Sequence, residues 1–474
     1  MTISPLFTDL YELTMAQGYL LNHHNPHVVF DMFFRRQPYG GGFAIFAGID
    51  TLLDDLEGLK FSCDDISYLG SLGYFGDEFL EYLSEFRFSG SVLSFREGSL
   101  VFPEEPLIRV EAPLIEAQII ESLLLNIVNF QTLIATKAAR VLVATEFGSI
   151  LEFGMRRAQG YNGALMASRA AYIGGASGTS NTLAGRLYNI PVSGTMAHSW
   201  VMAFDSEAES FERYSELYPD TSILLIDTFD TLNQGIENAI IIGKKLRKQG
   251  KRIGVRLDSG DLSYLSKQVR ARLDAAGLRY AFIAVSGDLN EQIAAQLLAE
   301  GAPVDVWGVG TQLATGHPDA AVSGVYKLSA RYQGRQIIPT MKVSNNPAKM
   351  TNPGIKQVFR FYDKDRTPLR DVIQLADEPI PEGPMELHHP TLHYKRTMFS
   401  AFHSAEEQLL PVMREGKRLN PQEDLKIIRD RVITQLQRMD ETFLRQINPH
   451  EYKISLSRAL RDLKFRMIDE YNRG

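Results

Sequence analysis

The stretch IPVSGTMAHSWVMAF, residues 190–204, puts a short apolar run directly before a turn of small residues and a histidine. The run Ile190–Val192 predicts a strand, and Trp200–Phe204 can form a helix. A strand that ends in such a turn brings the next side chains to the mouth of a parallel sheet, where α/β enzymes hold their reactive groups. His198 there can transfer protons or act as a nucleophile. The same residue can also be a packed or capping histidine, so the rest of the chain must decide.

Short apolar runs like this one recur along the middle of the chain, and helix-like segments separate most of them. The runs are Ser149–Phe153, Ala171–Ile173, Pro191–Ser193, Ser222–Ile226, Arg252–Leu257, Tyr280–Val285, Val304–Val309 and Val322–Leu328. Alternation of strand and helix over about 180 residues predicts a parallel α/β structure. Seven or eight units without a GxGxxG turn after the first strand favour a barrel, although periodicity alone also allows an open sheet.

Nearly every run ends in a polar residue or a glycine. These residues are Arg156, Gly174–Gly175, Thr195, His198, Asp227–Thr228, Arg256, Asp258, Ser286–Gly287, Gly308 and Gly310–Thr311. In a barrel such positions converge on the rim formed by the carboxyl ends of the strands, where active sites lie. The distribution therefore supports a barrel with its site on that rim.

The segments on either side of the repeat follow other patterns. Before it, a predicted helix precedes alternating segments with glycine turns, which is typical of an α+β layer. After it, the chain ends in charged, amphipathic helical sequence. We predict an α/β fold with an irregular TIM-like barrel and an α+β domain built from both ends of the chain. The predicted domains are residues 1–120, an N-terminal α+β domain; 121–332, the barrel; and 333–474, which partly completes the first domain and is partly helical.

Composition narrows the class of protein. The 474 residues are 44% hydrophobic and 23% charged, as in a soluble globular protein of more than one domain. The net charge of −7 argues against a general nucleic-acid binder. A single cysteine, Cys63, excludes an internal disulfide and a cysteine-rich zinc site. We find no signal-peptide pattern and no run of about 18 uncharged apolar residues, so we expect a cytoplasmic enzyme and no membrane span.

Two of the rim loops suit an anion. Ser286 and Gly287 end one strand just before a helix, whose positive end turns toward the loop. Gly308, Gly310 and Thr311 end the next strand and offer backbone N–H groups and a hydroxyl. Loops at this place in a barrel commonly bind phosphate, although ordinary glycine turns have the same composition.

Arg256 and Asp258 lie two apart on one predicted strand and therefore face the same way. If they face the barrel interior, both charges need a partner or a ligand. An arginine can bind a substrate carboxylate, and an aspartate can stabilise a developing positive centre or bind magnesium. A structural salt bridge explains the pair equally well. Clusters of histidine near His23 and His388 lack matching ligands and are expected to be exposed loop residues.

Taken together, the motifs resemble those of the nicotinate phosphoribosyltransferases, a family of type II phosphoribosyltransferases. The matching segments are Thr8–Met15, Phe33–Arg35, Glu152–Arg157, Gly178–Asn181, Gly194–Ser199, Gly254–Asp261, Val285–Asp288, Gly308–Thr311 and Val325–Leu328. They occur in the family's order, from residue 8 to about residue 360. Many members have histidine where this chain has Met196, a variable position, and the last ~100 residues carry little of the resemblance.

The resemblance implies a reaction. Nicotinate displaces pyrophosphate from phosphoribosyl pyrophosphate and forms nicotinate mononucleotide in NAD salvage. The transfer is coupled to ATP hydrolysis, as in a ligase, through a phosphorylated histidine that His198 matches. Magnesium is required, with ligands that the motifs do not identify. The family is typically dimeric with active sites near the interface, so Tyr11 can serve the neighbouring subunit of a homodimer.

Each candidate residue receives an expected role. Tyr11, Thr195 and Arg256 match nicotinate-site positions, and the ring of Phe153 or Tyr11 would stack on the pyridine. Asp258 would stabilise the oxocarbenium-like transition state beside His198. The residues expected to hold phosphoribosyl pyrophosphate are Arg156, Ser286, Gly287, Gly308, Gly310 and Thr311.

Two kinds of alternative stay open. A sister enzyme could use nicotinamide, which has no carboxylate for Arg256, or quinolinate, which has two and would need more basic residues. A non-catalytic nucleotide-binding regulator could share the scaffold, and in that case His198 would accept no phosphate.

Overall fold

The computed structural model describes residues 3–346, 349–381 and 383–473. The chain divides into two compact units by its internal contacts. The first unit comprises Met1–Leu133, Ala321–Asp424 and Arg431–Gly474, and the second comprises Ile134–Ala320 and Leu425–Asp430. One boundary falls inside the helix α6 (Glu121–Ala144), and the short stretch Leu425–Asp430 of the second unit is the first part of the helix α15 (Leu425–Arg438). Both ends of the sequence therefore belong to the first unit.

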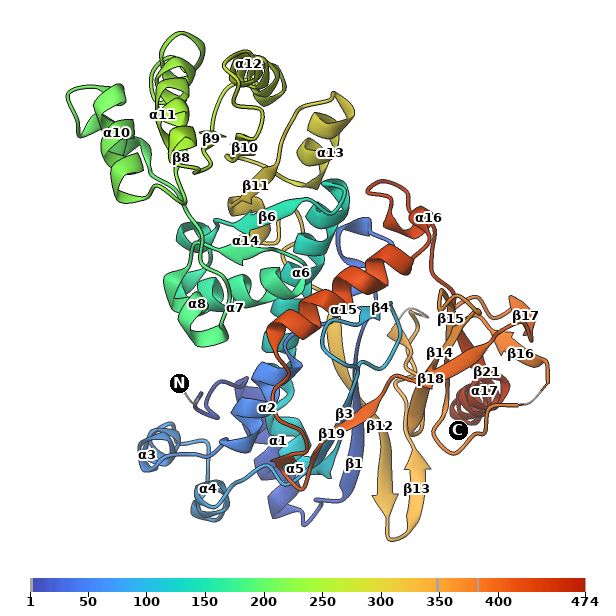
Figure 1. The fold of residues 1–474 in the computed structure, drawn as a ribbon. Helices are drawn as coiled ribbons and strands as arrows, with labels where there is room; N and C mark the ends of the chain where they lie inside the picture. Colours follow the sequence, from blue (N-terminus) through green and yellow to red (C-terminus); the bar gives the residue numbers. More distant parts are fainter. Residues whose placement is uncertain (1–2, 347–348, 382, 474) are drawn as a thin grey trace. The chain divides into compact units, whose positions relative to one another are not determined.

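A six-stranded parallel sheet forms the centre of the second unit, in the order β7-β6-β11-β10-β9-β8 (Figure 1). Its strands are β6 (Ser149–Glu152), β7 (Gly178–Thr179), β8 (Ile223–Leu225), β9 (Gly254–Leu257), β10 (Phe282–Val285) and β11 (Val306–Val309). These strands are short apolar runs. Apolar runs of this kind are typical of parallel sheets, whose two faces are both buried. Spatial order follows chain order, except that the last strand, β11, pairs with the first, β6.

The sheet extends by one more segment beyond β7. Val192 forms a parallel bridge with Thr179, and Thr179 exchanges backbone hydrogen bonds with Pro191 and Ser193. This is the run that leads into residues 194–199. Among the described residues, no backbone pairing joins this segment to β8, so the hydrogen-bonded ladder has its two ends there.

Helices follow the strands as the alternating pattern predicts. They are α7 (Gly160–Ile173), α8 (Thr182–Tyr188), α9 (His198–Met202), α10 (Glu207–Leu217), α11 (Ile236–Lys248), α12 (Leu262–Ala275), α13 (Glu291–Ala299) and α14 (Thr311–Ala314). Polar side chains set several starts: Asn181, Asp261 and Asn290 each accept a hydrogen bond from the first turn of the helix that follows. Because each cap comes within a few residues of a strand end, the helix starts and the rim loops lie together.

Two of the predicted strands of the repeat are wrong. Ala171–Ile173 is the last turn of α7, and the strand is instead β7. A short apolar run in a buried helix has the same composition as a buried strand, so periodicity could not separate them. Val322–Leu328 does not belong to the parallel sheet either, because most of it lies in β12 (Gly324–Gln333), which pairs antiparallel with β1 in the first unit.

The first unit contains two larger sheets. The seven-stranded antiparallel sheet has the order β13-β12-β1-β5-β3-β19-β20. Its strands are β1 (His27–Phe34), β3 (Ser91–Ser94), β5 (Ile108–Pro113), β12, β13 (Gln336–Pro339), β19 (Leu410–Arg414) and β20 (Lys417–Arg418). The six-stranded sheet is mixed, with the order β17-β16-β21-β15-β14-β18. Its strands are β14 (Lys356–Tyr362), β15 (Pro368–Leu375), β16 (Met385–His388), β17 (Arg396–Phe399), β18 (Ser404–Glu407) and β21 (Ile454–Ser457).

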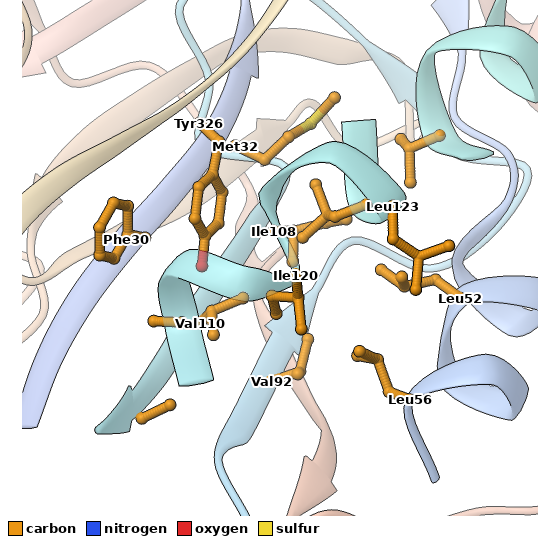
Figure 2. Close-up of a cluster of buried hydrophobic side chains, with 14 of the residues drawn as sticks. Phe30, Met32, Leu52, Leu56, Val92, Ile108, Val110, Ile120, Leu123 and Tyr326 are labelled. Carbon is orange, nitrogen blue, oxygen red and sulfur yellow. The ribbon is translucent and has the colours of Figure 1, made fainter. Parts of the chain in front are cut away.

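The core of the first unit lies between the antiparallel sheet and helices packed on one face of it. The helices of this unit include α1 (Leu10–Leu21), α2 (Ile49–Glu57), α3 (Cys63–Ser71), α4 (Asp77–Ser84), α5 (Leu114–Ile119) and α17 (Arg458–Arg473). Figure 2 shows Met32 and Ile108 from the strands facing Leu52 and Leu56 of α2. Each fully buried side chain of this kind stabilises the fold by about 1.5–3 kcal/mol.

One helix of the described chain, α6, is long and apolar enough to cross a membrane, by length and composition alone. However, 83% of its apolar stretch of 18 residues is buried inside the protein. Such burial is typical of the core helix of a soluble protein.

Candidate active site

Arg256 on β9 is the centre of a hydrogen-bonded cluster on the second unit. Its Nε donates to Ser286 Oγ at 2.8 Å, and its Nη1 donates to Thr195 Oγ1 at 2.6 Å. Nη1 also donates to the carbonyl oxygen of Met196 at 3.2 Å, and Nη2 donates to Asp258 Oδ1 at 2.8 Å. Three rim loops, which follow Val192, β9 and β10, therefore meet at one guanidinium group. The side chains of Arg256 and Asp258 lie on the same side of the strand, as their spacing predicts.

The carboxyl group of Asp258 is held in its ionised form. Burial acts to raise its pKa, but hydrogen bonds from Ser286 and Arg256 and the positive charge of Arg256 outweigh burial and lower the pKa below its ordinary value. Its side chain keeps 29% of its surface exposed, against 16% for Arg256. A stable anion that is still accessible beside a half-buried cation suits a site where positive charge develops.

His198 begins α9 on the same rim and is half-buried. Its Nδ1 lies 3.0 Å from Thr228 Oγ1, on the loop after β8. A positive charge on His198 would also lower the pKa of Asp258, since the imidazole lies near that carboxylate. If Nδ1 carries the proton that is shared with Thr228, Nε2 keeps its lone pair. In the described part of the chain, Nε2 has no hydrogen-bond partner.

Asp227 joins the loop after β8 to the loop after β9. Its Oδ2 accepts hydrogen bonds from the backbone N–H of Asp258 at 2.9 Å and from Ser259 Oγ at 2.6 Å. Its Oδ1 is buried and has no partner among the described residues. The sequence places Asp227 and Thr228 on the rim but assigns them no role in the predicted site. Their position directly after β8 is the sequence feature that indicates such a role.

Phe153, Gly308 and Ser286 lie together. A Cβ built on Gly308 would lie 2.7 Å from the Phe153 ring and 3.1 Å from the Cβ of Ser286. Gly308 therefore leaves room for the aromatic ring, and that ring lies next to a hydroxyl that Arg256 binds. Gly287 has a φ of +108°, and a Cβ there would lie 2.7 Å from the carbonyl oxygen of Asp258. Only glycine fits this approach without strain.

Glu152 anchors the loop that carries Phe153. Its buried carboxylate accepts hydrogen bonds from Ser168 Oγ at 2.9 Å and Thr179 Oγ1 at 2.6 Å, and from the backbone N–H of Gly154. The sequence motif contained Glu152, but no pattern distinguished this buried anchor from a surface residue.

The remaining predicted residues are less closely connected to the cluster. Arg156 is exposed in the short helix Met155–Arg157, and its side chain forms no hydrogen bond or ion pair with the described residues of the cluster. Gly310 precedes Thr311, which is half-buried at the start of α14. Tyr11 belongs to the first unit, where it is 51% exposed on α1. Burial and a hydrogen bond to Glu12 raise the pKa of the Tyr11 hydroxyl.

An open cavity of about 430 Å³ adjoins Asp258 and Ser286 in the second unit. Its acidic lining residues are Asp258, Asp261, Asp288 and Glu300. No group of three or more metal-ligating side chains occurs within the described ranges. Mg²⁺, however, is commonly held by one or two carboxylates together with water and substrate phosphates. The unpartnered Oδ1 of Asp227 and the acidic lining fit an ion of that kind.

The fold and the cluster are those of an α/β enzyme whose polar side chains gather at the carboxyl ends of parallel strands. Three family models match the chain in succession: the nicotinate phosphoribosyltransferase N-terminal domain at residues 6–129, the nicotinate phosphoribosyltransferase family at 149–342, and its C-terminal domain at 355–464. The chain belongs to the nicotinate phosphoribosyltransferase family.

Individual relatives cover nearly the whole chain. The nicotinate phosphoribosyltransferase of Bacillus subtilis is 42% identical over 469 residues, 98% of this chain and 95% of that protein. The Homo sapiens enzyme is 33% identical over 520 residues, 97% of this chain and 96% of that protein. The crystal structure of human nicotinic acid phosphoribosyltransferase matches with a TM-score of 0.85 at 31% identity, over 97% of this chain and 99% of that one. A nicotinate-nucleotide pyrophosphorylase from Pyrococcus furiosus shares the fold, with a TM-score of 0.71 at 22% identity.

Proposed function

We propose that the cluster around Arg256 and His198 is the active site of this enzyme, a nicotinate phosphoribosyltransferase of NAD salvage. The observation that carries the proposal is the convergence of Asp258, Thr195 and Ser286 on the guanidinium group of Arg256, with His198 on the same rim. A carboxylate-binding cation beside an ionised aspartate suits transfer of a sugar to nicotinate.

Nicotinate would bind through its carboxylate to Arg256. A guanidinium group has five N–H donors, and the bonds described above use four of them. The substrate carboxylate would take the fifth donor and displace a neutral acceptor, the Thr195 hydroxyl or the Met196 carbonyl. Thr195 could then donate its own hydrogen to the carboxylate. The Phe153 ring, next to Ser286, would stack on the pyridine.

Asp258 would stabilise the positive charge that develops on the ribose as the bond to pyrophosphate breaks. The nicotinate nitrogen lone pair forms the new bond to the anomeric carbon, and pyrophosphate leaves with the electron pair of the broken C–O bond. Ser286, Gly287, Gly310 and Thr311 would hold the phosphate-bearing end, and Arg156 would attract pyrophosphate. Gly308 contributes by making room for Phe153.

His198 would accept the terminal phosphate of ATP on Nε2. With Nδ1 hydrogen-bonded to Thr228, the Nε2 lone pair attacks phosphorus, and ADP leaves with the electron pair of the broken P–O bond. Water would later hydrolyse this phosphohistidine and couple ATP use to the transfer. Mg²⁺ would neutralise the phosphate charge, and Asp227 and Asp258 are the residues that would hold it.

The irregular TIM-like barrel remains our proposal for the second unit. The pairing of β11 with β6 and the parallel bridge at Val192 support it. The ladder is interrupted between the Val192 segment and β8. Side chains link the segment after Val192 to the neighbouring strands instead: His198 contacts Thr228, after β8, and Thr195 accepts a hydrogen bond from Arg256 of β9. The three domains 1–120, 121–332 and 333–474, a homodimer with active sites near its interface, and a cytoplasmic location are proposed with it.

A product assay tests the proposal. Purified protein is given phosphoribosyl pyrophosphate, Mg²⁺ and one base, with or without ATP, and the mononucleotide is quantified by liquid chromatography. We expect nicotinate mononucleotide, formed faster with ATP. Turnover of nicotinamide or quinolinate alone would favour a sister enzyme, and binding of ATP without turnover of any base would favour a regulator.

A further inference from the structure

The first unit has a cavity of its own, with a volume of about 520 Å³. This size is typical of sites for small organic ligands. Its lining comes from β14, β18, the turn before β4 (Leu100–Val101) and the second half of α15. Five arginines line it: Arg96, Arg360, Arg366, Arg431 and Arg438. Two glutamates, Glu406 and Glu407, are its acidic members.

Two of the arginines are neutralised inside the first unit. Arg366 forms an ion pair with Glu406 at 2.8 Å, and Arg431 binds Glu423 at 2.6 Å. Arg431 also donates to the carbonyl oxygen of Glu97 at 2.6 Å. These arginines therefore shape the wall of the cavity rather than offer charge to a ligand.

Arg360 is also ion-paired, with Asp371, but it is only 2% exposed and its hydrogen bonds leave one terminal nitrogen unused. Its Nε and Nη2 bind the carboxylate of Asp371 at 2.6–3.1 Å, and Nη2 also donates to the Leu100 carbonyl at 2.8 Å. Its Nη1 makes no hydrogen bond to any residue that the structure describes. This nitrogen therefore keeps N–H donors for an acceptor in the cavity.

Arg96 and Arg438 bring uncompensated charge to the same cavity. Both are exposed, and within the described ranges neither side chain has a hydrogen bond or an ion pair. The side chain of Glu407, 3.4 Å from Gln357 Nε2, forms no ion pair with either arginine in the described chain, and its single negative charge can offset only one of these two positive charges. Guanidinium groups that converge without carboxylate partners are typical of sites for phosphate groups.

The walls that carry these arginines are tied together. Gln435 of α15 accepts a hydrogen bond from the Leu100 backbone N–H at 3.2 Å and donates to the Gly98 carbonyl at 2.8 Å. The Arg366 guanidinium lies 4.7 Å from the ring of Tyr362, which forms a flat surface in the lining. A planar ring in a ligand can stack on such a surface while its phosphates reach the arginines.

We propose that the cavity lined by Arg96, Arg360 and Arg438 is a second binding site, which shares no residue with the cluster around Arg256 and takes a nucleotide that bears two or more phosphate groups. Its arginines bind the phosphates, and the surface formed by Tyr362 and Arg366 binds the base.

Isothermal titration calorimetry of the full-length protein with ADP tests the site. The test variant is R96S/R438S. The matched control is R335S/R473S, which removes two exposed arginines of the first unit that lie outside the cavity and have no described partner. We expect the wild type and the control to bind ADP at two sites per chain. In R96S/R438S one of the two should weaken at least tenfold, with synthesis of nicotinate mononucleotide unchanged.

Inorganic tripolyphosphate distinguishes a nucleotide site from a general anion site. ADP should bind the R96/R438-dependent site more tightly than tripolyphosphate, because only ADP has a ring to stack. Equal affinity would overturn the assignment to a nucleotide. Binding of ADP to R96S/R438S with wild-type affinity and stoichiometry would overturn the site itself. Neither result bears on the catalytic role of Arg256.

Discussion

At the scale of single residues, the site depends on how the hydrogen-bonding capacity of Arg256 is used. Four of its donors are bound within the second unit before any substrate arrives, which fixes the orientation of the guanidinium group. Asp258 accepts from both Arg256 and Ser286, and its lowered pKa keeps it ionised. Such preorganisation reduces the rearrangement needed in the transition state.

Replacing Arg256 with lysine separates the effect of the planar set of N–H donors of the guanidinium group from the effect of its positive charge. Lysine keeps a positive charge but cannot bind Ser286, Thr195 and a carboxylate in the same plane. We expect the KM for nicotinate to rise roughly 10- to 100-fold, about 1.4 kcal/mol for each tenfold, with the melting temperature little changed. Initial rates over a nicotinate series measure it, with Arg279→Lys, an exposed arginine of the same unit, as control. An unchanged KM would show that Arg256 does not bind the substrate carboxylate.

His198→Ala tests the phosphate acceptor. It should abolish ATP hydrolysis and leave some uncoupled formation of nicotinate mononucleotide, because Arg256 and Asp258 remain. Release of ADP and of product are measured in parallel, and intact mass spectrometry should find an acid-labile phosphate on the wild type alone. Ser199→Ala, the neighbouring exposed position, is the control. If the His198 variant hydrolyses ATP as the wild type does, the proposed role of this histidine is wrong.

At the scale of elements, strand ends and turns place the reactive groups. The loops after β8, β9 and β10 contact one another through Asp227, Asp258 and Ser286. The loop after β10 approaches the backbone of Asp258 closely only because residue 287 is glycine. A substitution at one turn should therefore disturb chemistry that another strand carries.

Gly287→Ala tests this close approach. The new Cβ would lie 2.7 Å from the Asp258 carbonyl oxygen at a φ of +108°. Gly250→Ala is a matched control, since Gly250 has a φ of +71° but no atom within 4 Å of its Cβ. The control should lose about 1–2 kcal/mol of unfolding free energy from backbone strain alone. Gly287→Ala should lose more, and its kcat/KM for phosphoribosyl pyrophosphate should fall at least tenfold. Urea unfolding and steady-state kinetics measure both variants. If Gly287→Ala and Gly250→Ala lose the same unfolding free energy and the same kcat/KM, the close contact of residue 287 with Asp258 is contradicted.

The turn between β4 and β5 holds a titratable group. Burial raises the pKa of Glu104 to about 7, partly offset by Lys464 and Arg35. Because this folded-state pKa lies above the unfolded value, the contribution of Glu104 to stability is complete below about pH 4.5 and is lost as the pH rises through 7. The glutamine of the Glu104→Gln variant does not titrate. The melting temperature of this variant should therefore rise relative to that of the wild type as the pH is raised from 5 to 8.

Differential scanning calorimetry at both values measures this gain. Glu81→Gln, at an exposed helix position, should show no such pH-dependent difference. A Glu104→Gln variant that tracks the wild type at both pH values would rule out a titrating Glu104.

At the scale of the whole molecule, segments far apart in the sequence form one unit. β12 and β19 complete the antiparallel sheet begun by β1, β5 and β3, so the first unit cannot form from the N-terminal residues alone. Tyr11 belongs to that unit, whereas Arg256 belongs to the other. The proposed dimer would allow Tyr11 to serve the site of a second chain.

Complementation between two inactive variants tests the dimer. Tyr11→Ala and Arg256→Ala are co-expressed with different tags, and the doubly tagged species is purified. If Tyr11 acts in the partner's site, random pairing gives one intact site in half of the dimers, and the unfractionated mixture should recover about a quarter of wild-type activity. Each variant alone is the control. A mixture that stays inactive would place Tyr11 in the site of its own chain or outside the site.

Much of this organisation was predictable, and the failures have a physical cause. The alternating runs predicted the parallel sheet, and the residues after its strands predicted the cluster of Arg256, Asp258, Thr195, Ser286 and His198. Ala171–Ile173 was misassigned because a short apolar run is compatible with either a buried helix or a buried strand. The sequence assigned no role to Asp227. Its Oδ1 becomes buried without a partner only when the loop after β8 packs against the loop after β9, and no local pattern predicts that packing.

By itself, the sequence determined the local features: the strand–helix alternation, the helix caps, the glycine turns and the residue types at each strand end. These follow from side-chain periodicity and backbone conformation, which act over a few residues. Only the tertiary structure decided that β12 leaves the parallel sheet for β1, that one guanidinium joins three loops, and that five arginines surround a cavity in the first unit. Such contacts depend on which distant segments bury their apolar faces together, and no local pattern records that choice.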